Sequence, residues 1–456
     1  MRGQFNGRNM HPYKFLSLIV LAALTGCAGM VGEKRHSPAE IAAYRPQDFI
    51  AAIASTEGER VAVAERNDRI RLALEQPLPA ASGDEDSGVP GALWAIAFLN
   101  ADRAQGLGIL QNALAGIESK PVDFQRAVLS AAYTMYPRES APMLMPLLER
   151  IATPREFAIA CYAILKADDT PDTRARLRAM LVTRFPDWAV EARLVALEHA
   201  LTTNLAAERL TRPPLVDLLA APVRPGLPVV FSFQRPDRSR VGLAMVRGAD
   251  GRFVRNADGS YFNIAHLALA LSNLPGTITN GNTPQGLFTI VGAGTATNPW
   301  IGPTPYLHSK VPKEASVAEF EHAAVEGDWS EARYESFLPP SWRGYFPFKE
   351  AWLAGQAGRD EMLMHGTTIN PEYYRNNPYY PGTPSAGCLV AMEYWSKPDG
   401  RLVHSDQLTL AKAFTAGGND QGYLAVVELD DRPAPVNLAD VVRDVIAAEL
   451  RVRQGR

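Results

Sequence analysis

The chain has 456 residues, with 46 basic and 49 acidic side chains and a formal net charge of −3. A mildly acidic chain of this kind argues against nucleic acid as a partner. It contains three Cys, at positions 27, 161 and 388, with no obvious disulfide pair among them.

The first residues have the pattern of a secretory signal. Arg2, Arg8 and Lys14 precede an apolar run at 15–24 that is too short to span a bilayer comfortably. The motif Leu-Thr-Gly-Cys that ends at Cys27 fits a lipobox, in which the Cys is lipidated on its sulfur and becomes the mature N-terminus. An ordinary cleaved signal and an uncleaved anchor are the alternatives.

Lipidation of Cys27 would fix the location of the protein. Residues 1–26, the expected lipoprotein signal peptide, carry three basic and no acidic side chains, so their removal lowers the net charge from −3 to −6. A diacyl anchor holds a protein on a membrane without crossing it. Ala28 after the Cys, where Asp would argue for inner-membrane retention, favours the outer membrane. We therefore expect a bacterial cell-envelope lipoprotein that faces the periplasm.

The next part of the chain is almost wholly helical in pattern. A polar, Gly/Pro-rich break at 77–90 interrupts it. We assign residues 27–90 to the anchor, short helices and a flexible linker, and residues 91–212 to a helical domain. Cys161 lies in an apolar helical run and indicates plain packing. Because this half carries no catalytic cluster, we expect it to bind a protein partner.

A repeat is visible inside the helical domain. Trp94, Phe124, Phe157 and Trp188 are spaced by 30, 33 and 31 residues. Three predicted helix starts have Pro in the first turn and an acidic residue beside it, which suits a helix N-terminus: Pro121, Pro154 and Pro186. This period predicts stacked helix pairs, and an irregular helical bundle is the alternative.

Five prolines between 213 and 228 mark a domain boundary, beyond which short β-branched or alternating runs are separated by turns. We expect strands at 228–233, 241–246, 252–255, 286–291 and 422–429. Residues 314–354 are predicted to form an insertion of helix and loop. A last helix, within 436–456, follows Asn437 and places Leu438, Val441, Val442, Val445 and Ile446 on one face. The expected fold is α+β: a helical repeat-like domain followed by a mostly β domain at 225–432.

Two short motifs carry the candidate chemistry. Met-His-Gly-Thr ends at Thr367, and Ser-Ala-Gly-Cys ends at Cys388. A thiol beside a glycine can meet a substrate, and His365 within reach could take its proton, because the thiolate is the nucleophile. Residues 367–384 are rich in Pro, Gly and Tyr and are predicted to form a loop that could bring the motifs together. Taken singly, the two residues are typical of a packed Cys and a packed or surface His.

The order His-Gly, long loop, Ser-x-Gly-Cys resembles the L,D-transpeptidase catalytic domain, whose pattern is His-Gly followed by Ser-His-Gly-Cys. Residues 279–290 resemble the Thr-Pro-x-Gly-x-Phe-x-Ile strand of that family. Two motifs in the right order are more specific than either alone. The resemblance covers residues 228–430 and leaves the helical half outside it.

The resemblance implies roles for the motif residues. Cys388 would be the nucleophile and His365 its base, and backbone N–H groups around Gly387 and Cys388 would form the oxyanion hole. The carbonyl of Gly366, or Thr367, would orient the imidazole. Four residues would shape the turn or line the substrate site: Ser385, Ala386, Thr367 and Tyr380. The substrate would be a peptidoglycan stem peptide that loses its terminal D-alanine, with an amine as acceptor and with neither cofactor nor metal.

The chain departs from the family pattern in three ways. Ala386 stands where a second His is usual, residues 389–391 lack the Arg that commonly follows the Cys, and the segment 366–384 is longer than usual. A hydrolase that uses the same Cys, for stem trimming or detachment of a wall protein, and a lipid-anchored peptidoglycan-binding scaffold are the alternatives. The acyl acceptor stays open between a stem peptide, a protein, a D-amino acid and water.

A metallopeptidase is the weakest alternative, because the His residues lack the His-Glu-x-x-His spacing of a zinc site: His308, His365 and His404. We therefore expect no metal.

Overall fold

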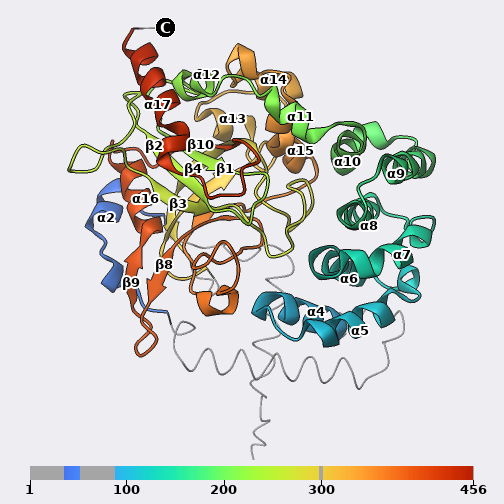
Figure 1. The fold of residues 1–456 in the computed structure, drawn as a ribbon. Helices are drawn as coiled ribbons and strands as arrows, with labels where there is room; N and C mark the ends of the chain where they lie inside the picture. Colours follow the sequence, from blue (N-terminus) through green and yellow to red (C-terminus); the bar gives the residue numbers. More distant parts are fainter. Residues whose placement is uncertain (1–34, 52–87, 297–300, 455–456) are drawn as a thin grey trace, which may run out of the picture.

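The computed structural model describes residues 35–51, 88–296 and 301–454 (Figure 1). Helices and strands account for 45% and 16% of the described residues, so the fold combines α and β structure as expected. The predicted signal peptide, the candidate lipidation site Cys27 and most of the predicted linker lie outside the described residues. None of the described helices is both long enough and apolar enough to cross a membrane.

A closed barrel of eight strands forms the second half of the chain. Its strands follow one another in the order β1 (Val229–Gln234), β10 (Gly422–Glu428), β4 (Gly286–Thr295), β5 (Pro305–Lys310), β6 (Met364–His365), β7 (Leu389–Ala391), β3 (Ile264–Leu267) and β2 (Gly242–Arg247). The pairs β1–β10 and β6–β7 are parallel, and the other neighbours are antiparallel. A separate hairpin pairs β8 (Glu393–Trp395) with β9 (Leu402–Ser405).

Both faces of the barrel wall are covered, which is why β1 is buried along its whole length. Side chains alternate along a strand, so Phe231 packs with one cluster and Val230 with another. The first cluster includes α12 (Leu215–Ala220) and α17 (Leu438–Arg453), and the second includes α16 (Asp406–Thr415). A strand buried on both faces is mostly apolar, as β1 is, and its two polar residues, Ser232 and Gln234, are buried as well.

Four of the five predicted strands are present as β1, β2, β4 and β10. The prediction of a strand at 252–255 is wrong: Phe253 and Arg255 form isolated bridges, to Arg247 and Tyr261 respectively. The Gly-rich turn before this segment and the short hairpin after it leave too few residues for a continuous ladder.

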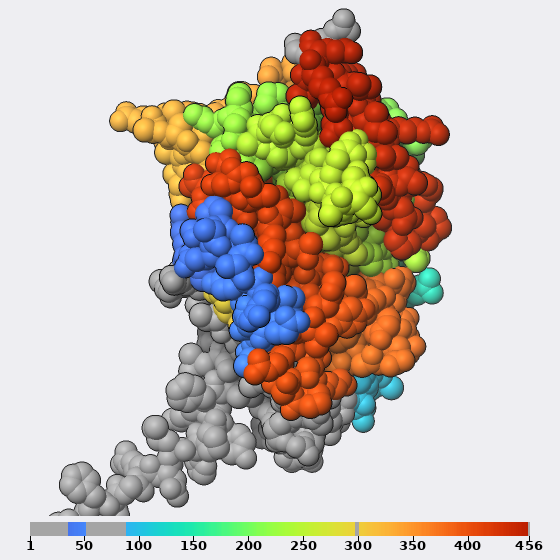
Figure 2. All heavy atoms as spheres, turned by 90° about the vertical axis from the view of Figure 1, so that its left-hand side faces the viewer, coloured from blue at the N-terminus to red at the C-terminus, as the bar shows by residue number. Residues whose placement is uncertain are grey.

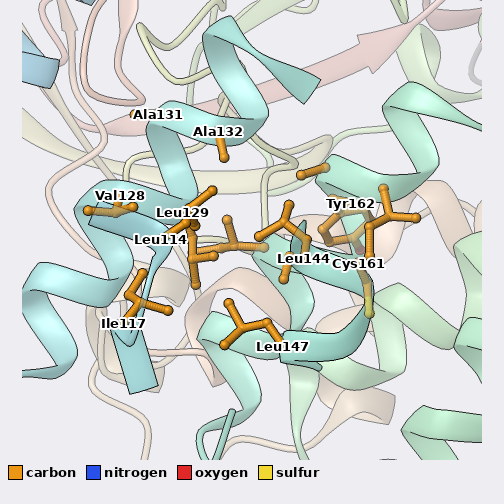
Figure 3. Packing of buried hydrophobic residues seen from close by; sticks show 14 of the residues in the cluster. Leu114, Ile117, Val128, Leu129, Ala131, Ala132, Leu144, Leu147, Cys161 and Tyr162 are labelled. Atoms are coloured by element: carbon orange, nitrogen blue, oxygen red, sulfur yellow. The ribbon is translucent and has the colours of Figure 1, made fainter. Parts of the chain in front are cut away.

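The helical half comprises α4 (Gly88–Leu99), α5 (Arg103–Leu114), α6 (Val122–Met135), α7 (Pro137–Leu147), α8 (Pro154–Ala167), α9 (Pro171–Arg184), α10 (Ala192–Thr202) and α11 (Leu205–Leu210). Figure 1 shows α4–α10 stacked along one side of the barrel. Helix α8 packs on α6, α7 and α10, and its residues 156–164 are all buried. Figure 3 shows this core around Leu129, Leu144 and Cys161.

Proline opens several of these helices, as predicted. Pro121 is the N-cap of α6, and Pro154 is the first residue of α8, with Glu156 in the first turn. The third predicted start is wrong: Pro186 precedes the 3₁₀ turn Trp188–Val190, and α10 begins only at Ala192.

The two ends of the described chain are attached to the barrel. Segment 35–51, with α2 (Pro38–Ala43), lies against α16 and β9 (Figure 2). Its Ile41 is fully buried among barrel residues. At the other end α17 begins after Asn437, as predicted, and packs on α12. Its apolar face is narrower than predicted, because Ile446 is 46% exposed.

An insertion of short elements between β5 and β6 packs against the barrel. It contains α13 (Val317–Glu321), α14 (Glu331–Ser336) and α15 (Glu350–Gln356), as the mixed pattern of 314–354 predicts. Its buried aromatic side chains join the α12 and α17 cluster: Phe320, Tyr334, Trp342, Phe348 and Trp352.

Candidate active site

The barrel brings the two sequence motifs onto adjacent strands. In the parallel pair β6–β7, Met364 lies opposite Leu389 and His365 lies opposite Val390. Cys388 directly precedes β7, and side chains alternate along a strand. Cys388 and His365 therefore project from the same face of the wall as diagonal neighbours.

The Cys388 thiol is buried in an apolar environment. Only 2% of the residue is exposed, and its neighbours in the cluster are Ala296, Ile301, Tyr306 and Leu363. The sulfur accepts the Leu363 N–H at 3.4 Å, and the thiol donates to a backbone carbonyl, that of residue 361, also at 3.4 Å. The N–H favours the thiolate, whereas the carbonyl favours the protonated thiol.

His365 is oriented by the residue that follows it. Its Nδ1 lies 2.5 Å from the Gly366 carbonyl oxygen, which assigns the proton to Nδ1 and leaves Nε2 as the basic nitrogen. Nε2 is buried and has no hydrogen-bond partner in the described structure. The Cys388 thiol is directed at main-chain groups instead, so proton transfer to Nε2 needs the two side chains to come closer.

Gly366 is required by a buried acid that the sequence motif does not reveal. A Cβ at this position would overlap the Glu393 carboxyl group. That carboxyl accepts hydrogen bonds from Ser405 Oγ at 2.7 Å and Trp395 Nε1 at 3.2 Å, and the same indole donates to the Thr367 carbonyl at 2.8 Å. Burial raises the pKa of Glu393 to about 8, so the group is mostly neutral at pH 7.

The turn before Cys388 has a defined geometry. Gly387 has a φ of +126°, which strongly favours glycine. Ser385 shapes the turn, because its Oγ accepts the Gly387 N–H at 3.0 Å and donates to the Cys388 carbonyl at 2.8 Å. Thr283 donates to the Gly387 carbonyl at 2.9 Å. The Gly387 N–H is therefore bound to Ser385 in this structure, and an oxyanion hole formed by N–H groups around Gly387 and Cys388 stays a prediction.

The other predicted substrate residues are more scattered. Ala386 is half-buried beside Ser385, and Thr367 is buried with its Oγ1 accepting the Ile369 N–H at 3.1 Å. Tyr380 is 37% exposed, and its hydroxyl donates to Glu372 on the same loop at 2.8 Å.

A second histidine, His266 on β3, lies close to His365. Its Nδ1 is 3.0 Å from Ser232 Oγ, and its Nε2 is buried without a hydrogen-bond partner in the described structure. Burial, reinforced by His365, lowers the pKa of His266 to about 3, so the ring is neutral. Within the described ranges no three His, Cys, Asp or Glu side chains are grouped to hold a metal ion.

The helical half supports two loops that frame the site. Leu274 and Ile278 are buried in the same core as α4–α10, and Thr134 of α6 donates to the Ser272 carbonyl at 2.8 Å. On the other loop, Tyr374 donates to the Phe98 carbonyl of α4 at 2.7 Å. This shared core argues against a helical half that folds and acts apart from the barrel.

Sequence reasoning missed Glu393, His266 and a buried arginine, Arg359. None of them belongs to a motif with fixed spacing, and the contacts of Glu393 with Gly366, of Arg359 with Gly387 and of His266 with Ser232 join residues that are distant in the sequence. Comparisons of the chain with protein-family models, with curated proteins and with solved structures found no match.

Proposed function

We propose that the protein is a cysteine-dependent L,D-transpeptidase acting on peptidoglycan stem peptides. The observation that carries the proposal is the placement of Cys388 and His365 on one face of adjacent parallel strands, with His365 Nδ1 held by the Gly366 carbonyl. On this proposal the barrel is an L,D-transpeptidase-like domain, and the helical half is a repeat-like module.

The reaction follows from which nitrogen of His365 is basic. Nε2 takes the thiol proton, and the thiolate of Cys388 attacks the carbonyl between the L-centre of the diamino acid and the terminal D-alanine. The imidazolium returns the proton to the leaving D-alanine amine as the carbon–nitrogen bond breaks, and a thioester remains. The amine of a second stem attacks the thioester, gives its proton to Nε2 and restores the thiolate as the new amide forms.

The proposed cellular location rests on the N-terminal sequence pattern and, like the activity, is a proposal. Lipidation at Cys27 would hold the enzyme on the outer membrane facing the periplasm, where peptidoglycan lies. The helical half would bind a protein partner through the surface that it turns away from the barrel.

The test is incubation of the protein with purified muropeptides, followed by mass spectrometry of the products. Cross-linked or amine-exchanged stems identify a transferase, whereas stems that have only lost D-alanine identify a hydrolase. Cys388→Ala should abolish turnover, and His365→Ala should lower it by about 10²–10⁴-fold. Cys161→Ala is the matched control, because Cys161 is also a buried thiol and burial raises its pKa well above the usual range.

If Cys388→Ala keeps wild-type turnover, the enzyme assignment fails. Muropeptide binding without turnover by the wild-type protein would instead support the peptidoglycan-binding scaffold.

A further inference from the structure

Arg359 lies buried where two site loops meet. It belongs to the segment between α15 and β6, and only 5% of it is exposed. Its guanidinium donates to three backbone carbonyls of the loop that precedes β4: those of Gly276, of Asn282 at 2.8 Å and of Gly281 at 3.0 Å. Arg359 thus ties this loop to the segment that leads into β6.

The same guanidinium packs against the residue that precedes the nucleophile. A Cβ on Gly387 would overlap Nη2 of Arg359 and would also approach the Gly281 carbonyl. Glycine at 387 is therefore required by a close contact as well as by its positive φ. The contact places a guanidinium one residue from Cys388.

The guanidinium remains charged at this position. Burial lowers the pKa of Arg359 to about 10, while Glu350 and Cys388 oppose that shift, so the group stays protonated at neutral pH. Glu350 also binds this loop: its carboxyl accepts hydrogen bonds from the Gly276 N–H at 2.9 Å and from the Gln285 N–H at 2.8 Å. Arg359 donates its hydrogen bonds to neutral backbone carbonyls. These carbonyls do not neutralise its positive charge, which can therefore stabilise a neighbouring thiolate.

We propose that Arg359 is a positioning residue that stabilises the Cys388 thiolate and fixes the Gly387 turn. The inference rests on the proposed function, since it concerns the same nucleophile. Other titratable groups near the thiol are His365 on β6, Tyr306 on β5 and Glu361. The backbone carbonyl of Glu361 accepts a hydrogen bond from the thiol. His365 is the base, and Arg359 is the fixed cation.

The experiment measures how fast iodoacetamide alkylates Cys388 in the full chain between pH 5 and pH 10, read by mass spectrometry of the Cys388 peptide. Arg359→Gln should raise the apparent thiol pKa by about 1–3 units and slow alkylation at pH 7 by about 10–1,000-fold. Arg359→Lys keeps the charge and should stay within about one unit of the wild type.

Arg247→Gln is the matched control. Arg247 is equally buried, burial lowers its pKa to about 10, and it donates to the Leu219 and Ala221 carbonyls near α12. Its replacement should leave the Cys388 profile unchanged.

A wild-type alkylation profile in Arg359→Gln would overturn the inference. If that variant does not fold, a rise of more than one unit in Arg359→Lys would do the same. The two proposals can fail separately. If Arg359→Gln shifts the pH profile of Cys388 alkylation but the wild type turns over no muropeptide, only the proposed function is refuted. If the profile does not shift but the wild type shows Cys388-dependent turnover, only the role of Arg359 is refuted.

Discussion

Replacing Glu393 by Gln tests whether the acid behind Gly366 is neutral in the folded protein. Burial raises the pKa of Glu393 from 4.5 to about 8. A carboxyl with a raised pKa stabilises the fold fully below the unfolded pKa of 4.5, and this contribution is lost as the pH rises toward 8. At 1.36 kcal/mol per pH unit, the loss between pH 5 and pH 8 reaches about 4 kcal/mol. Glu393→Gln keeps the shape and removes the titration.

Urea unfolding at pH 5, 6, 7 and 8 measures this effect as the difference in unfolding free energy between variant and wild type. The difference should shift in favour of Glu393→Gln by several kcal/mol as the pH rises, with an unchanged m-value. Asp48→Asn is the control: a hydrogen bond from Arg45 holds the pKa of Asp48 below its usual range, so its difference should not vary with pH in this window. Parallel stability curves for Glu393→Gln and wild type would refute the assignment of a neutral Glu393.

Two further predictions concern the other parts of the chain. Leu274→Ala removes a fully buried side chain from the core that the barrel loop shares with the helical half; we expect a loss of about 2–5 kcal/mol in unfolding free energy by urea denaturation, and a cost near zero would show that this contact is not packed. Cys27→Ala should abolish metabolic labelling with a fatty acid and move the protein from the membrane fraction to the soluble fraction; unchanged labelling would contradict lipidation.

The sequence was informative where a pattern is local. Strands such as β1 and β10 are six or seven residues long and rich in β-branched and aromatic side chains, so their composition predicts them. Strands β6 and β7 have two and three residues, too short for any periodicity, and they exist because β5 and β3 pair with them on either side. Their pairing nevertheless places His365 beside the residues that follow Cys388, as a loop at 367–384 that brings the two motifs together would do.

Arg359 and Glu393 could not be predicted from the sequence, for a physical reason. Arg359 contacts Gly387 and Glu393 contacts Gly366, and the two residues of each pair lie far apart along the chain. An isolated Arg or Glu in a sequence is most often solvated, so neither residue type carries a signal. The glycines they contact, Gly366 and Gly387, did carry a signal, because both belong to the sequence motifs. In the structure a Cβ on Gly366 would overlap the buried Glu393 carboxyl, and a Cβ on Gly387 would overlap the buried Arg359 guanidinium.

Access to the sulfur is a further requirement of the proposed catalysis. Only 2% of Cys388 is exposed, and Ile301 and Tyr306 pack beside it, so a peptide carbonyl would reach Sγ only after side chains around the thiol move. The Gly387 side of the turn is held from behind by Arg359 and Thr283, whose loop is in turn packed into the helical half through Leu274. The turn that carries Cys388 is therefore held by loops of the barrel and, through Leu274, by the helical half.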